Sequence, residues 1–163
     1  LSTALDEADK PASAAGKIRL LIAGSAMDDS EFIKNIEDLG AVVVADALCF
    51  GARNFSSLTD ETIDPLDALV QRYYYHVPCP RMAGEYRRRL EFVKQQAERA
   101  RVDGVILEYI KFCDLHGTDN ALLKNDLEKA GIPTIELERQ YGPLADAGRV
   151  RTRVQAFLER IRR

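Results

Sequence analysis

Two kinds of hydrophobic pattern alternate along this chain. Short apolar runs predict buried β-strands at residues 18–23, 41–45, 104–107 and 132–137. Stretches with apolar residues every three or four positions predict amphipathic helices at residues 29–39, 65–74, 83–101, 119–130 and 150–161. Strands that alternate with helices favour right-handed crossovers and therefore a parallel sheet with helices on both faces.

The expected fold is an open α/β domain with about four parallel strands. We expect the strand order 2-1-3-4, as in a flavodoxin-like half. Ligands of such sheets bind beyond the carboxyl ends of the strands, at the point where the strand order reverses. The longest irregular region, residues 46–64, leads away from that end of the second strand. Loops of this length in compact domains are usually functional or disordered.

The domain organisation follows from length and composition. The chain has 163 residues, which suits one domain with a full core. Residues 1–16 are rich in Ala, Ser and acidic side chains and are expected to be a linker or lead-in segment. Residues 17–163 are expected to form a single α/β domain. Because the chain begins at Leu1 and not at Met, we expect it to be cut from a longer polypeptide.

Composition and charge exclude several classes of protein. Hydrophobic residues make up 46% and charged residues 30%, and the net charge is −3, so there is no general basic surface for nucleic acid. Apolar runs are far too short to span a bilayer, and no stretch has the pattern of a signal peptide. The sequence therefore predicts a cytoplasmic protein with no nucleic-acid or membrane partner.

Three cysteines are the most informative residues. Cys49 and Cys113 each follow a predicted strand, and Cys79 lies in the loop before the long helix, so all three are expected near one rim of the sheet. Their odd number and wide spacing disfavour a disulfide framework. Thiolates in such loops can bind soft metals or iron–sulfur clusters, whereas a single cysteine is usually a small buried apolar residue. The sequence has no Cys-x-x-Cys, so the fold itself would have to bring the ligands together.

Other polar residues near these loops have two interpretations each. His76 and His116 flank cysteine loops, so a Cys–His nucleophilic pair is conceivable, but ordinary loop histidines are the favoured interpretation and no nucleophile elbow is present. Gly24 and Ser25 precede a helix start, where free N–H groups can hold an anion such as a cofactor phosphate, but a plain strand-to-helix turn is the alternative.

Two repeated triplets have structural explanations. The tyrosines at residues 73–75 are expected to pack against the core at the end of a helix. The arginines at residues 87–89 are expected on a solvated helix face, although a basic rim could also hold the phosphates of a coenzyme.

With these motifs the sequence resembles the C-terminal half of subunits of the 2-hydroxyacyl-CoA dehydratases and ATP-dependent benzoyl-CoA reductases, of the D-component type. The resemblance covers nearly everything after Lys17. The matching stretches are residues 37–46, 49–53, 78–80, 103–106, 111–114, 131–133 and 151–159.

This resemblance implies a concrete chemistry. Subunits of the family hold a 4Fe–4S cluster through three cysteines, which suggests Cys113 first and then Cys49 and Cys79 as metal ligands here. A separate ATP-dependent iron–sulfur activator protein supplies one electron, and ketyl-radical chemistry on an acyl-CoA thioester follows. The implied partners are the acyl-CoA substrate, a second homologous subunit and the activator.

The resemblance also limits what this chain can do alone. Family subunits have another α/β half before this one, so at least one cluster ligand can come from that half, and the isolated domain is expected to be inactive. Dehydration (a lyase reaction) and ring reduction (an oxidoreductase reaction) both remain open, and no catalytic residue is assigned. The alternative is a non-catalytic flavodoxin-like assembly or electron-transfer module whose cysteines are incidental.

Overall fold

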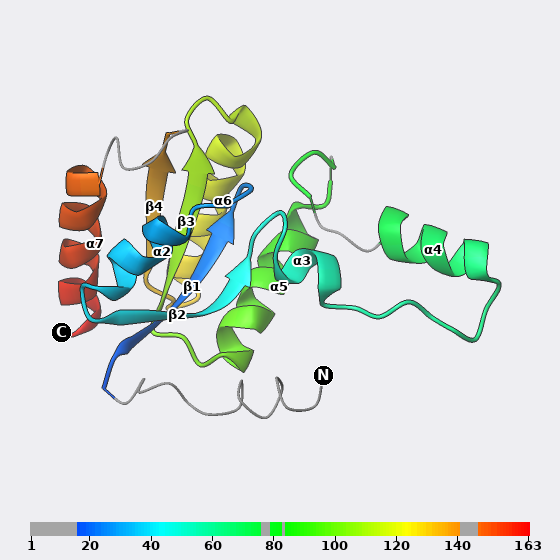
Figure 1. Cartoon of the computed structure of the whole chain (residues 1–163), viewed down its shortest axis with the longest axis horizontal. Coiled ribbons are helices and arrows are strands. Elements are labelled where there is room, and N and C mark those ends of the chain that lie inside the picture. Colours follow the sequence, from blue (N-terminus) through cyan, green and yellow to red (C-terminus); the bar gives the residue numbers. More distant parts are fainter. Residues whose placement is uncertain (1–15, 76–78, 83, 141–146) are drawn as a thin grey trace.

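Four parallel strands form the centre of the molecule. The computed structural model describes residues 16–75, 79–82, 84–140 and 147–163. The strands are β1 (Ile18–Gly24), β2 (Ala41–Ala47), β3 (Gly104–Ile110) and β4 (Thr134–Arg139), and they are ordered β2-β1-β3-β4 (Figure 1). Every neighbouring pair is parallel. The predicted α/β class, the parallel sheet and the strand order are confirmed.

Helices cover both faces of the sheet, as predicted. Two helices, α2 (Ser30–Glu37) and α7 (Ala147–Ile161), pack over one face, where Leu20, Ile22 and Ile106 point. The helices α5 (Tyr86–Arg99) and α6 (Asp114–Lys129) pack over the other face, against Leu21, Val105 and Leu107. Each face therefore buries alternate residues of the same strands, which is why these strands read as continuous apolar runs.

Some elements extend beyond the predicted limits at the carboxyl ends of the strands. β3 continues through Glu108 to Ile110, and β4 runs to Arg139 instead of ending at residue 137. α6 begins five residues before the predicted start at residue 119. The hydrophobic pattern missed these residues because polar side chains are buried there, among them Glu108, His116 and Arg139.

β1 and β3 approach closely at Gly24. This glycine has a φ of 146°, and a Cβ added to it would lie 1.8 Å from the carbonyl oxygen of Glu108. Only glycine allows that contact, so the sequence at this position fixes how tightly the two central strands meet at their carboxyl ends.

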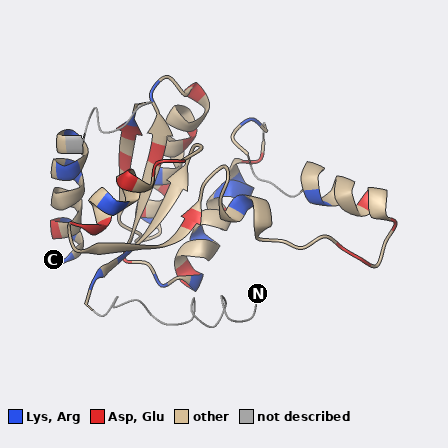
Figure 2. Cartoon of the chain, in the orientation of Figure 1, with Lys and Arg blue, Asp and Glu red and all other residues tan. Residues whose placement is uncertain are grey.

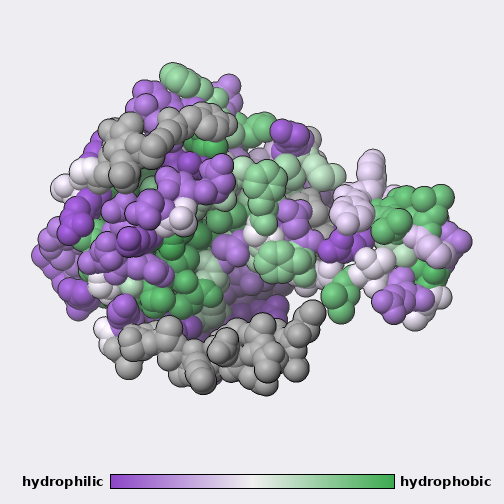
Figure 3. Space-filling view, in the orientation of Figure 1, coloured by the Kyte–Doolittle hydropathy of each residue, from purple (hydrophilic) through white to green (hydrophobic). Residues whose placement is uncertain are grey.

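A helical arm departs from the domain after β2. A short helix, α3 (Ala52–Phe55), is followed by irregular chain and by α4 (Pro65–Tyr74), which projects away from the sheet (Figure 1). Apolar side chains cover much of this arm (Figure 3). Tyr73, Tyr74 and Tyr75 are 60–67% exposed, so the expectation that they pack against the core is wrong. Their helix has no sheet face to pack against.

Two further points concern the surface and the ends of the chain. Acidic and basic residues are interspersed over the helices of the domain (Figure 2). None of the helices within the described residues is long and apolar enough to cross a membrane. The predicted lead-in segment, residues 1–16, lies outside the described residues except for Gly16, so its role stays a prediction.

Candidate functional site

Cys49 lies at the carboxyl end of the sheet, where three parts of the chain converge on its sulfur. Arg53 of α3 donates from Nη2 to Sγ at 2.7 Å. Nε2 of His116, in the first turn of α6, is 3.6 Å from the same sulfur. The carbonyl oxygen of Gly24, at the end of β1, is 3.8 Å from it. The fold thus brings Cys49, Gly24 and His116 together from distant parts of the sequence.

Two backbone carbonyl groups hold the Arg53 side chain in place beside Cys49. It is buried, and it donates from Nε to the carbonyl oxygen of Leu48 at 3.2 Å and from Nη2 to that of Gly24 at 3.3 Å. Nothing in the local sequence marks Arg53 as a buried site residue. The available signal was its position four residues after Cys49, which places both groups at the same short turn and helix.

Burial favours the neutral form of the Cys49 thiol. Desolvation raises its pKa, and the nearby Arg53 guanidinium opposes that effect without reversing it. A neutral thiol can donate to the Gly24 carbonyl while its sulfur accepts from Arg53. In this arrangement Cys49 ties β1, α3 and α6 together.

His116 is held as a neutral imidazole. It is 6% exposed, and its pKa is lowered to about 4, first by burial and then by the charge of Arg53. Asp119 opposes this shift, and Arg89 adds to it. Cys49 and His116, which the sequence allows as a Cys–His pair, are therefore in contact. A nucleophilic pair of this kind needs a thiolate beside a protonated imidazolium, and the burial of His116 and the charge of Arg53 disfavour that protonated form. His76, the other histidine considered, lies outside the described residues.

A buried ion pair holds the loop that contains Cys79. Arg89 of α5 donates to both carboxylate oxygens of Asp119 on α6, at 2.6 and 2.9 Å. Its Nη1 donates to the backbone carbonyl oxygen of Cys79 at 2.9 Å. The expected solvated face therefore holds for Arg87 and Arg88 but is wrong for Arg89, which is only 7% exposed. A negative charge on Cys79 would raise the pKa of Cys49.

Cys113 differs from Cys49 in its surroundings. It is the N-cap residue of α6, directly after β3, and it is half-buried. Its backbone is fixed because its N–H donates to the Ile110 carbonyl and its carbonyl accepts from Gly117 N–H, both at 2.9 Å. Within the described ranges, no hydrogen bond to its sulfur is found. Because His116 lies in the same helical turn and contacts Cys49, Cys113 belongs to the same rim.

The described part of the chain does not by itself complete a metal site. Among its residues, no group of three or more His, Cys, Asp or Glu side chains is arranged to hold a metal ion. Cys113, Cys49 and Cys79 share one end of the sheet, but their assignment as cluster ligands stays a prediction. A cluster would need ligands from outside these residues or a rearrangement of this rim.

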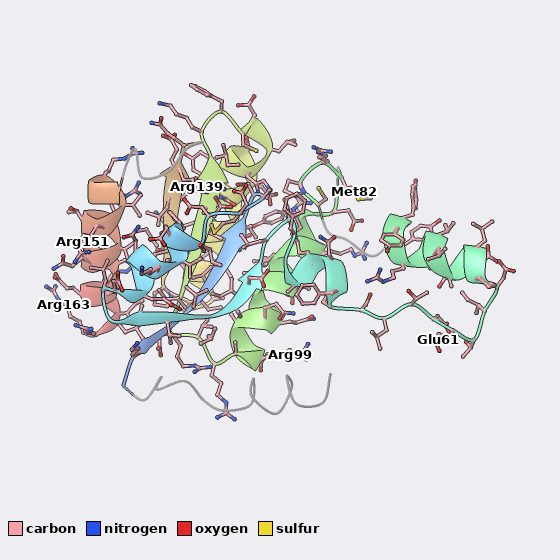
Figure 4. All side chains as sticks on the ribbon, in the orientation of Figure 1. Glu61, Met82, Arg99, Arg139, Arg151 and Arg163 are labelled. Atoms are coloured by element: carbon pink, nitrogen blue, oxygen red, sulfur yellow. The ribbon has the colours of Figure 1, made fainter. Side chains whose placement is uncertain are left out.

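A second buried polar cluster surrounds Glu108. Its carboxylate is fully buried and accepts from Ser25 Oγ at 2.9 Å and from Arg139 Nε at 3.2 Å. Arg139, labelled in Figure 4, also donates to the Ala26 carbonyl at 2.6 Å. Burial raises the pKa of Glu108, while Ser25 and Arg139 oppose that shift. Sequence reasoning missed this cluster, whose only signal was a glutamate directly after an apolar run.

These contacts do not favour the predicted anion site at Gly24 and Ser25. The Ser25 hydroxyl is already engaged with the Glu108 carboxylate and also accepts from Ile110 N–H at 3.2 Å. At the start of α2, the Asp29 carboxylate accepts from the N–H groups of residues 31 and 32. An incoming anion would meet two carboxylates, so anion binding here remains a prediction without a supporting contact.

Comparisons with known proteins agree on one family. The chain matches the family 2-hydroxyglutaryl-CoA dehydratase, D-component, over residues 1–161. It is 28% identical over 141 residues to the (R)-phenyllactyl-CoA dehydratase beta subunit of Clostridium sporogenes. The aligned region covers 86% of this chain and 37% of that protein. The chain is 30% identical over 144 residues to the dehydratase subunit YjiM of Escherichia coli (strain K12), with the same two coverages.

The chain thus spans little more than a third of the length of these relatives. The family match extends over nearly all of its residues and includes every strand of the sheet and all three cysteines. This chain belongs to the 2-hydroxyglutaryl-CoA dehydratase D-component family.

Proposed function

We propose that this chain is part of a subunit of a 2-hydroxyacyl-CoA dehydratase, a lyase that removes water from an acyl-CoA thioester. The family match and the names of both relatives support dehydration over the ring reduction of benzoyl-CoA reductases. The structural observation that supports the proposal most is the rim at the carboxyl ends of the strands, which carries Cys49 and Cys113.

The proposed cofactor is a 4Fe–4S cluster, and Cys113 is the ligand that this chain offers most directly. Its sulfur has no hydrogen-bond partner in the described region, and it is half-buried at the start of a 16-residue helix. The positive end of a helix dipole favours the negative charge of a thiolate ligand. When bound, such a cluster supplies single-electron chemistry that no side chain provides.

Cys49 is less available as a ligand in this arrangement. To bind iron it would have to exchange its contacts with Arg53 and Gly24 for a metal. Cys79 lies on a loop whose backbone is held by Arg89, so it could turn toward an incoming group without breaking the ion pair beneath it. The remaining ligands are proposed to come from the rest of the subunit.

The residues beneath the rim have positioning roles in this proposal. Asn120 and Ser25 fix the end of β3 by donating to Glu108, and the Arg89–Asp119 pair joins α5 to α6. These buried contacts would hold the start of α6, and with it Cys113, in one place. The proposed partners are an acyl-CoA substrate, a second homologous subunit and an ATP-dependent iron–sulfur activator, all in the cytoplasm.

The test is to replace Cys113 with serine in the full-length subunit, prepared anaerobically with its partners. We expect Cys113→Ser to fold normally, to contain less iron and to lose acyl-CoA turnover, because a hydroxyl is a much poorer ligand for iron than a thiolate. Iron content, EPR spectra and circular dichroism measure these three properties separately.

The companion variant is Cys49→Ser in the same protein. Retained iron with lower stability would assign Cys49 to its contacts with Arg53 and Gly24, whereas lost iron would make it a cluster ligand as well. Unchanged iron and turnover in a folded Cys113→Ser variant would contradict the ligand role. That result would favour the alternative of a non-catalytic assembly module.

A further inference from the structure

Asn120 has one polar atom without a partner in the interior. This residue of α6 is fully buried, and its Nδ2 donates to the backbone carbonyl of Glu108 at 3.2 Å. Its Oδ1 is buried and has no hydrogen-bond partner among the described residues. Turning the amide over would place Oδ1 against the Glu108 carbonyl, so the orientation is set by that contact. Folded proteins rarely leave such an acceptor unpaired.

A small cavity lies beside this residue, behind the Cys49 rim. Its volume is about 20 Å³, and its polar walls come from Arg53, Arg89, His116, Asp119 and Asn120. The rest of the wall is apolar and comes from β1, β2, α5 and α6. A cavity needs roughly 10–15 Å³ and two or more polar neighbours to hold one water molecule. This cavity meets both conditions.

The chemistry of the walls selects the occupant. The occupant must donate a hydrogen bond to Oδ1 of Asn120, which a halide ion cannot do. The guanidinium groups of Arg53 and Arg89 repel a metal cation. The volume excludes any organic ligand. A water molecule both donates and accepts, so it can serve Oδ1 and an N–H group of the opposite wall at once.

We propose that one internal water molecule occupies this cavity and donates a hydrogen bond to Oδ1 of Asn120. The water completes a polar connection between the end of β3 and the groups behind Cys49, since Asn120 already holds the Glu108 carbonyl. Asn120 lies two turns along α6 from the N-cap residue Cys113. The internal water is thereby part of the structure that fixes the start of this helix, whatever cofactor the rim binds.

The first experiment is a crystal structure of the full-length subunit at about 1.2 Å resolution. We expect an ordered, spherical peak at about 2.7–3.2 Å from Oδ1 of Asn120. A second crystal, soaked in bromide, separates water from a halide by anomalous scattering. Empty density in the cavity, or a bromide peak there, would overturn the proposal.

A pair of variants tests the same site in a second way. Asn120→Leu is nearly isosteric but cannot bind the water, so we expect its crystal to lack the peak and its urea midpoint to be lower. Asn125→Leu is the matched control on the same helix, because Asn125 is exposed and donates only to the neighbouring Asp126 side chain. It should keep both the peak and the midpoint. If Asn120→Leu does not fold, the wild-type and bromide crystals still decide, and a peak that persists in Asn120→Leu would refute the assignment.

Discussion

His116 gives this domain a pH-dependent stability that can be calculated from its surroundings. The imidazole is buried against Cys49, with Arg53, Asp119 and Arg89 as its charged neighbours, and its pKa is lowered to about 4 from an ordinary value of 6.5. In the unfolded chain it regains the ordinary value. Between these two values the unfolded chain binds a proton that the folded chain does not, so unfolding becomes easier as the pH falls.

The magnitude follows from that difference in pKa. The stabilising contribution is fully present above the unfolded pKa and is lost as the pH falls toward the folded pKa. One pKa unit corresponds to about 1.4 kcal/mol, so the free energy of unfolding should fall by about 2 kcal/mol between pH 7 and pH 5 through this residue alone. A loss of that size is a large part of the stability of an ordinary domain.

The assay is urea unfolding of the chain at several pH values, followed by circular dichroism. His116→Gln cannot take up the proton, so we expect its stability to fall less steeply over this pH range than that of the wild type, by about 2 kcal/mol. The control Gln95→Ala, at an exposed residue of α5 that does not titrate, should keep the wild-type slope. Equal slopes for wild type and His116→Gln would refute the argument that His116 is buried as a neutral group.

Two buried features give further predictions for the same unfolding assay. Gly24→Ala should lower the free energy of unfolding by more than about 3 kcal/mol, because its Cβ would meet the Glu108 carbonyl. The control Gly148→Ala, with nothing within 4 Å, should be neutral or stabilising by about 0.5–1 kcal/mol. Arg89→Met alone should cost about 3–5 kcal/mol by leaving a buried carboxylate unpaired. Adding Asp119→Leu should restore part of that loss, and strictly additive losses would count against the buried pair.

The fold was predictable because the two central strands, β1 and β3, are buried on both faces. Runs such as residues 20–23 and 105–107 are apolar at every position, and that pattern with intervening helices specifies a parallel sheet. The carboxyl ends of the strands were not predictable in this way. There Glu108 and Asn120 are buried through specific partners, and a hydrophobic pattern records polarity but not pairing.

The candidate site was predictable in position but not in its contacts. Strand order placed Cys49 and Cys113 at one rim, as the topology of parallel sheets requires. The sequence could not show that Arg53 would meet Cys49 or that Arg89 would turn inward, because both depend on long-range packing. An arginine in a run of three at residues 87–89 has the same local signal whether it faces water or Asp119.

The arm formed by α4 has a consequence for how this sequence is constrained. Leu66 and Tyr73 are 70% and 67% exposed, so the folding of the α/β domain gains little from them. Apolar groups held in water lower solubility and promote self-association, and stability of the domain supplies no reason to keep them. Replacing these exposed residues by polar ones would not lower the stability of this domain. If related proteins keep apolar residues along the arm, the selection that keeps them must therefore come from something other than the stability of this domain.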